Sequence, residues 1–80
     1  MNNKEKLYSL LSNILEIEVS DINEETSPSN TESWDSFNAL VLVTELEETF
    51  EVSFTMDEVQ SVKNVNDIID TLKTYSVSFD

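Results

Sequence analysis

Apolar residues recur along this chain at the spacing of an α-helix, and this periodicity decides which folds the chain can adopt. In the first segment they fall at i, i+3, i+4, i+7 and i+8, which places them on one face of a helix. That face comprises Leu7, Leu10, Leu11, Ile14 and Leu15. A second helical set comprises Ala39, Leu42, Val43, Leu46 and Phe50. The pattern predicts an all-α protein.

Polar residues indicate where the first two helices begin and end. Asn2 precedes Glu5 by three residues, which is the spacing of a capping box, and predicts a helix over residues 3–16. Residues 17–35 are rich in Ser, Thr, Asn, Asp and Glu and contain the one proline of the chain, so we expect a long loop there. The second helix is expected over residues 36–51.

Two further helices follow, and each has its own cap. Thr55 and Glu58 have capping-box spacing and start a short third helix that ends near Val62. Asn64 caps a fourth helix, and Asp67 lies in its first turn, where the helix dipole favours an anion. The buried face of this helix is expected to comprise Ile68, Ile69, Leu72 and Tyr75.

These elements predict one domain over residues 1–80. It is a small four-helix bundle of three main helices and one short helix, with a long loop between helices 1 and 2. The ordered part is expected over about residues 3–76, and residues 77–80 form a frayed tail unless Val77 and Phe79 pack. Beyond the first helix, the predicted core comprises Val43, Leu46, Phe50, Phe54, Val59, Val62, Ile68 and Leu72.

Two details of the bundle depend on particular side chains. The long loop is too apolar in places to lie free in water, and the residues expected to pin it to the core are Ile17, Val19 and Ile22. The chain has no glycine, which is the usual residue in the left-handed position after a helix. The substitutes available are Asn13, Asn30 and Asn64.

The composition excludes several classes of chemistry. The chain has no His, Cys, Arg or Gly, so it lacks the usual general base, a thiolate nucleophile, a soft metal ligand and a glycine-rich phosphate loop. We therefore expect neither an enzyme nor a metal site. The net charge of −13 disfavours nucleic acid as a partner. Without a signal peptide core or a membrane-length apolar run, a cytoplasmic protein with no membrane partner is expected.

The charge is also unevenly placed. Residues 7–62 contain thirteen acids and no base. Such a stretch is either an ordinary solvated surface or a docking face for basic partners, where complementary charge accelerates association and rejects wrong partners.

Asp35 and Ser36 stand where the loop ends and the second helix begins. Helix capping alone explains a serine or an aspartate at that place. The outer face of the same helix adds a second signal, because an apolar pair follows Ser36 and acids follow the pair, which is typical of an interface with a charged rim. The alternative is that the loop folds over the apolar pair. The candidate interface comprises Phe37, Val41, Thr44, Glu45, Glu47 and Glu48.

The second helix strongly resembles that of the acyl carrier protein and peptidyl carrier protein family. The similarity is carried by Asp35-Ser36 and by the run Leu40-Val41-Leu42-Val43-Thr44-Glu45-Leu46-Glu47-Glu48-Thr49-Phe50, which ends in a Leu-Glu-Glu-x-Phe spacing. It covers about residues 4–76, including the long first loop and the short third helix. The Asp-Ser pair alone is a weak signal, whereas the combination in one short acidic chain is specific.

The resemblance implies a role for each site residue. Ser36 would receive a 4′-phosphopantetheine arm from coenzyme A, and the thiol of the arm would hold acyl or aminoacyl groups as thioesters. Asp35 would assist this modification, with capping as the alternative. The apolar pair would fill a notch on partner enzymes, and the acids would pair with partner Arg or Lys. The implied partners of this monomer are a phosphopantetheinyl transferase, a loading ligase or transferase, and synthase enzymes with basic docking patches.

Departures from the family pattern bear on the pathway. Phe37 replaces a common Leu, and Asn38 and Val41 replace acids that are frequent in fatty-acid carriers. Trp34 before the Asp-Ser pair is similar to stand-alone carriers of polyketide, non-ribosomal peptide and aminoacyl-transfer pathways. The predicted function is a stand-alone carrier in such a secondary-metabolite pathway, with a fatty-acid-synthesis carrier or a D-alanine-type aminoacyl carrier as alternatives.

Two readings from other classes stay open at this point. An acidic helical interaction or inhibitor module explains the charge equally well but not the exposed apolar pair after Asp-Ser. A hydrolase with paired carboxylates needs a walled cleft, for which a thin four-helix core leaves little room. The apolar residues of the last three helices form either a packed core or a cavity for an acyl chain.

Overall fold

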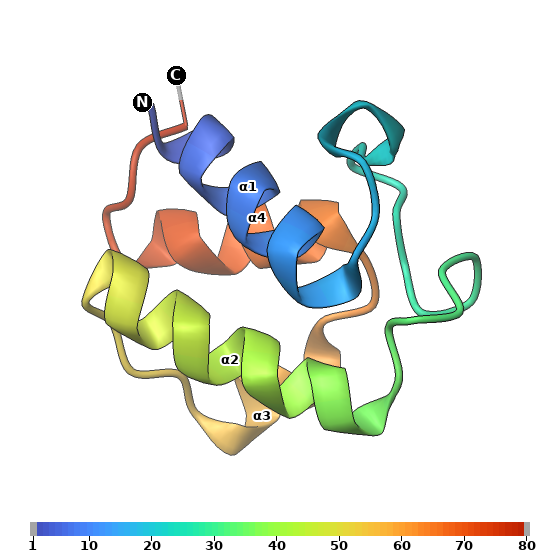
Figure 1. Ribbon diagram of the computed structural model, residues 1–80. Helices are drawn as coiled ribbons and strands as arrows, with labels where there is room; N and C mark the ends of the chain where they lie inside the picture. The colour runs from blue at the N-terminus through green and yellow to red at the C-terminus, as the bar shows by residue number, and fades with distance from the viewer. Residues whose placement is uncertain (1, 80) are drawn as a thin grey trace.

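The computed structural model of the chain describes residues 2–79, and throughout this range the regular structure is helical, without a strand. The order is α1 (Asn3–Leu15), a single turn of 3-10 helix η1 (Val19–Asp21), α2 (Ser36–Phe50), α3 (Met56–Ser61) and α4 (Val65–Thr74). Figure 1 shows α2 and α4 running in one direction, α1 running back against them, and α3 below α2. The predicted all-α four-helix bundle is confirmed.

The helices begin at the predicted caps. Asn2 Oδ1 accepts the N–H of Glu5 at 2.8 Å, and Asn64 Oδ1 accepts the N–H of Asp67 at 2.8 Å. Thr55 begins α3 with a complete capping box, in which each side chain of the pair accepts the other residue's backbone N–H. These caps depend on residues three apart, which is why the sequence alone predicts them.

The C-terminal ends of α1 and α2 differ from the prediction. Glu16 (φ 56°) and Glu51 (φ 54°) occupy the left-handed positions, and neither Asn13 nor Asn30 has a positive φ. The asparagines available as substitutes for glycine are therefore not used at these two helix ends, and Asn64 caps the start of α4, as predicted. A side chain with a Cβ in this conformation costs about 1 kcal/mol relative to glycine. Both carboxylates also lie at the negative end of a helix dipole.

The core lies where α1 crosses α2 and α4. Its buried side chains are Leu7, Leu10, Leu11, Leu15, Ile22, Trp34, Leu42, Leu46, Val65, Ile68, Ile69 and Leu72. Five residues predicted to be core are only half-buried around it, namely Val43, Phe50, Phe54, Val59 and Val62. Four of these five border a small apolar cavity, and Phe50 packs at the end of α2 against the C-terminal segment.

Residues 16–35 form a long loop that is tied to both ends of the core. Ile22 is buried as predicted, whereas Val19 is 46% exposed and does not pin the loop. Trp34, which the sequence analysis did not place in the core, is 5% exposed and provides the second anchor. The carbonyl of Thr26 accepts the N–H of Val65 at 2.9 Å, and the carbonyl of Glu24 accepts that of Asn66 at 3.0 Å. The loop thereby satisfies first-turn donors of α4.

The segment after α4 is not frayed over the described residues. Asn3 Nδ2 donates to the Ser78 carbonyl at 2.8 Å, and the rings of Phe50 and Phe79 lie 6.3 Å apart. Residues 77–79 therefore pack back onto α1 and α2, so the alternative in which Val77 and Phe79 pack is realised in place of a frayed tail. Residue 80 lies outside the described residues.

Candidate functional site

The N-terminus of α2 is fixed by its own first turn. Asp35 Oδ1 accepts the N–H of Asn38 at 2.9 Å, so Asp35 is the N-cap and Ser36 is the first helical residue. Asn38 Nδ2 in turn donates to the Ser33 carbonyl at 2.7 Å. The two bonds join the end of the loop to the start of the helix. The capping alternative for Asp35 is thus realised in the structure.

Ser36 presents an uncommitted hydroxyl to solvent. Its side chain is exposed, and within residues 2–79 its hydroxyl makes no hydrogen bond. The first N–H groups of a helix have no intrahelical acceptor, and the dipole makes this end positive. A phosphate ester on Ser36 would lie beside these donors at the start of a 15-residue helix. The chemistry of this position fits an anionic group attached through oxygen.

The predicted interface residues fall into two groups. Phe37 is 73% exposed, so the loop does not cover it, while Val41 is half-buried. Glu47 is also half-buried, and its Oε2 accepts the N–H of Phe54 at 2.8 Å, which commits this carboxylate to the α2–α3 connection. The residues exposed on α2 as predicted are Phe37, Thr44, Glu45 and Glu48.

Two exposed apolar residues were missed by the sequence analysis. Leu40 is 65% exposed on α2, and Met56 is 69% exposed at the start of α3. Leu40 follows Phe37 by three residues, so both lie on one face of the helix. That spacing was the signal that could have identified Leu40. No comparable signal exists for Met56, because its helix is too short to show a periodicity.

An apolar cavity of about 110 Å³ lies behind this site. Its walls come from α2, α3, α4 and the loop, and Trp34 joins it to the start of α2. The lining residues are Pro28, Trp34, Ala39, Leu42, Val43, Leu46, Phe54, Glu58, Val59, Val62, Ile68 and Thr71. Several side chains predicted to form the core therefore also line an apolar cavity.

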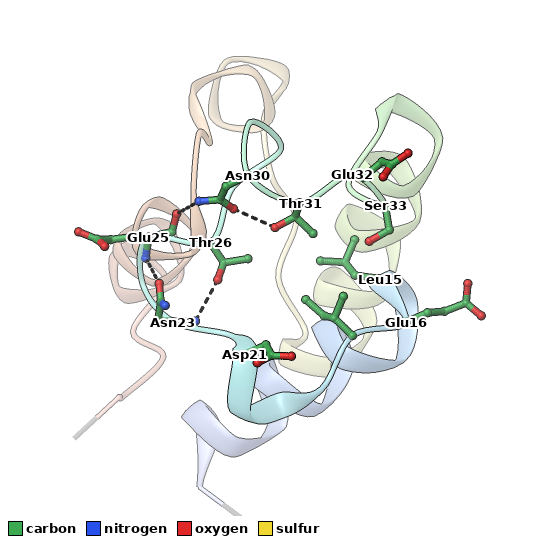
Figure 2. Close-up of a pocket in the computed structure, with 11 residues that line it drawn as sticks. Leu15, Glu16, Asp21, Asn23, Glu25, Thr26, Asn30, Thr31, Glu32 and Ser33 are labelled. Carbon is green, nitrogen blue, oxygen red and sulfur yellow. Dashed lines mark hydrogen bonds between the residues drawn. The ribbon is translucent and has the colours of Figure 1, made fainter.

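A larger depression of about 760 Å³ lies on the loop side, between the end of α1 and residues 21–33. Figure 2 shows that the side chains of Asn23, Thr26, Asn30 and Thr31 bond within the loop itself. Asn23 Oδ1 accepts the N–H of Glu25, and Asn30 Nδ2 donates to the Glu25 carbonyl. No group of three or more His, Cys, Asp or Glu residues suited to a metal ion occurs within the described part of the chain. The depression is thus a product of loop packing.

Among the described helices, none has both the length and the apolar character needed to cross a bilayer.

Comparison with known families gives one match over most of the chain. A family model described as "Phosphopantetheine attachment site" matches residues 5–72. An acyl carrier protein of Syntrophus aciditrophicus is 29% identical over 80 residues, which is 100% of both chains. An acyl carrier protein of Porphyromonas gingivalis is 31% identical over 70 residues, covering 88% of this chain and 90% of the relative.

Solved structures show the same fold. A Mycobacterium tuberculosis chain described as an acyl carrier protein superposes with a TM-score of 0.81 at 22% identity, covering 90% of this chain and 96% of the other. The solution structure of a holo acyl carrier protein from Geobacter metallireducens superposes with a TM-score of 0.76 at 22% identity, covering 100% of this chain and 98% of the other. Both share the helical arrangement described above.

Proposed function

Because the chain belongs to the phosphopantetheine-attachment family of acyl carrier proteins, we propose that Ser36 is the residue that carries its 4′-phosphopantetheine arm. Members of this family hold the arm covalently and are carriers that phosphopantetheinyl transferases and synthase enzymes act upon. The arm supplies the thiol on which acyl groups travel as thioesters, and this chain has no cysteine of its own.

The observation that carries the assignment is the exposed, unbonded hydroxyl of Ser36 on the first residue of α2. Asp35 holds the turn through its bond to Asn38, which fixes where the Ser36 oxygen stands. The free N–H groups of the same turn favour the phosphodiester that would form there. We propose that Asp35 assists the modification as well as capping the helix.

Intact mass spectrometry tests the assignment. After incubation with coenzyme A, Mg²⁺ and a broad-specificity phosphopantetheinyl transferase, the chain is expected to gain the mass of one arm. Ser36→Ala should gain nothing, because the acceptor oxygen is gone. Ser53→Ala, which removes another exposed hydroxyl outside any helix, should gain the full mass.

A gain retained by Ser36→Ala would place the arm on another hydroxyl. Failure of the folded wild-type chain to gain mass would instead support an acidic interaction module. Both results contradict the assignment, and they are distinguished by the wild-type spectrum alone.

We further propose that the enzymes that act on Ser36 bind to the exposed face of α2. Phe37 and Leu40 form its apolar centre, and Val41 contributes from a half-buried position. Thr44, Glu45 and Glu48 form the polar rim, where carboxylates suit basic patches on partners. Glu47 contributes only its negative charge to the docking face, because its carboxylate already accepts the N–H of Phe54.

Phe37→Asp is expected to lower kcat/KM for modification of the chain by roughly tenfold, because an apolar anchor at the centre of an interface is lost. The far-UV circular dichroism spectrum should not change, since Phe37 is largely solvent-exposed. Val19→Asp places the same change on an exposed apolar residue of η1 and serves as the control. Unfolding of Phe37→Asp, or an equal effect of Val19→Asp, would contradict a docking role for this face.

The cargo and pathway are also proposals. An apolar cavity of about 110 Å³ next to the attachment site favours an acyl chain of a few carbons, given that an apolar cavity of about 150 Å³ holds benzene. The Trp34-Asp35-Ser36 sequence and the absence of acids at Asn38 and Val41 support a stand-alone carrier of a polyketide, non-ribosomal peptide or related pathway. The mass of the group carried by protein isolated from its native host tests both.

A further inference from the structure

Helix α3 is the least buried wall of the apolar cavity. It is six residues long and none of its residues is buried. Nevertheless the segment around it lines the cavity through Phe54, Glu58, Val59 and Val62. A helix this short gains little from its own backbone bonds. Its position over the cavity must therefore depend on a few contacts with its neighbours.

Glu58 makes the side-chain hydrogen bond that joins α3 itself to the end of α4. Its Oε1 accepts the N–H of Thr55 at 2.8 Å and also the hydroxyl of Tyr75, the residue that ends α4. The ring of Tyr75 packs edge-on against Phe54, with centroids 5.7 Å apart. One carboxylate oxygen thus caps the short helix and fastens it to the longer one.

Apart from the Glu58 bonds, α3 is attached to the bundle at the connections that precede and follow it. On its N-terminal side, the N–H of Phe54 donates to Glu47 Oε2 of α2 at 2.8 Å. On its C-terminal side, Val62 ends the helix in an extended conformation, and the next residue is tied to α4 because the N–H of Lys63 donates to Asp67 Oδ2 at 3.0 Å. The connections at both ends of α3 are non-helical and the side chains beneath it are half-buried.

We propose that the Tyr75–Glu58 hydrogen bond is a latch that holds α3 closed over the apolar cavity, and that breaking it lets α3 swing away and opens the cavity. Tyr75 is a positioning residue in this scheme and touches no cargo. Local opening of a weakly anchored segment is a known mode of motion in folded proteins. The latch does not depend on the carrier function, and it can be tested on the unmodified chain.

The charges around Tyr75 support a closed latch at neutral pH. The pKa of Glu58 is lowered by the Thr55 backbone N–H and then by the Tyr75 hydroxyl, and the pKa of Tyr75 is raised chiefly by its bond to Glu58. Glu47 of α2 adds a further negative charge facing Tyr75. The stabilisation is lost as pH falls through the folded pKa of Glu58, below 4.5, and as pH rises through that of Tyr75, above 10.0.

Tyr75→Phe in the full-length chain tests the latch, because it removes only the hydroxyl and keeps the ring against Phe54. Trp34 is the single tryptophan and lines the cavity, so acrylamide quenching of its fluorescence reports opening. We expect the quenching constant and the amide exchange rate of Val59, whose N–H bonds to Thr55, both to rise roughly fivefold. Amides of α1 should exchange as in the wild type.

Three control variants separate the latch from simpler effects. Glu58→Gln keeps an oxygen that accepts the Tyr75 hydroxyl and should retain most of the closed state. Thr55→Ala weakens the cap of α3 without touching Tyr75, and should raise Val59 exchange while leaving Trp34 quenching unchanged. Tyr8→Phe removes the other tyrosine hydroxyl, which makes no hydrogen bond within the described residues, and should change neither.

Unchanged quenching in Tyr75→Phe, or an equal rise in Tyr8→Phe, would overturn the proposal. Tyr75→Phe could loosen the whole bundle, in which case α1 amides would also exchange faster. A pH titration of the wild-type chain then tests the latch in place of this variant. Trp34 quenching in the wild-type chain should rise reversibly as the Tyr75 tyrosinate forms above pH 10.0, before loss of circular dichroism. A quenching constant that stays flat through that transition would also overturn the proposal.

Discussion

Trp34→Ala is expected to lower the free energy of unfolding by about 3–5 kcal/mol. The indole is 5% exposed and belongs to the core, although it comes from the loop. Its removal leaves a hole between α2 and the loop that this thin core cannot readily refill. Domains of this size have a total stability of roughly 4–12 kcal/mol, so the change removes a large part of it. Urea denaturation followed by far-UV circular dichroism measures the loss.

The conservative replacement Trp34→Phe separates packing from loop anchoring. It keeps an aromatic ring at the same place and should be destabilising by less than half as much as Trp34→Ala. The modification rate of Ser36, corrected for the folded fraction, should fall in Trp34→Ala as well, since residue 34 is two positions from the acceptor serine. A loss of stability below about 1 kcal/mol in Trp34→Ala would contradict the anchoring role.

The second large effect is a stabilisation. The double variant Glu16→Gly, Glu51→Gly is expected to raise the free energy of unfolding by about 2 kcal/mol, because each glycine adopts the left-handed conformation without a Cβ and removes an acid from a helix C-terminus. For a domain of this length, that gain corresponds to a rise in Tm of roughly 8–16 °C. Thermal unfolding followed by circular dichroism measures it.

Glutamine variants separate the two causes. Glu16→Gln with Glu51→Gln removes both charges but keeps both side chains in the left-handed conformation, and should give less than half of the glycine effect. Equal Tm values for the glycine and glutamine pairs would show that charge alone is responsible. A fall in Tm of the glycine pair would contradict both contributions.

The parts of the fold that the sequence predicts are those set by neighbours a few residues apart. The caps at Asn2, Thr55 and Asn64 depend on spacings of three residues, and the helix faces depend on a repeat of similar length. The burial of Trp34 and the identity of Phe50 as the partner of Phe79 were not predictable, because each joins segments that only the folded chain brings together. The same holds for the carbonyls of Thr26 and Glu24, which accept N–H groups of α4 from a distant part of the sequence.

The candidate site also contains features that the local sequence predicts and features that depend on long-range contacts. The position of Ser36 at the start of α2 follows from the local sequence, and so does the cap formed by Asp35. The commitment of Glu47 to Phe54 does not, because it requires the α2–α3 connection to fold back onto α2. The left-handed glutamates escaped prediction for another reason: statistical preference favours asparagine there, whereas the helix ends are fixed by packing of the residues around them.

The bond between Asn3 and the Ser78 carbonyl has a practical consequence for work with this chain. It brings the start of α1 and the segment at Ser78 together at one corner of the bundle, and Figure 1 shows that corner on the opposite side from the start of α2. An affinity tag, a fluorophore or a fused enzyme joined at either end is therefore directed away from Ser36. Immobilised arrays and tethered multi-enzyme assemblies can use either terminus and leave Ser36 accessible to partner enzymes.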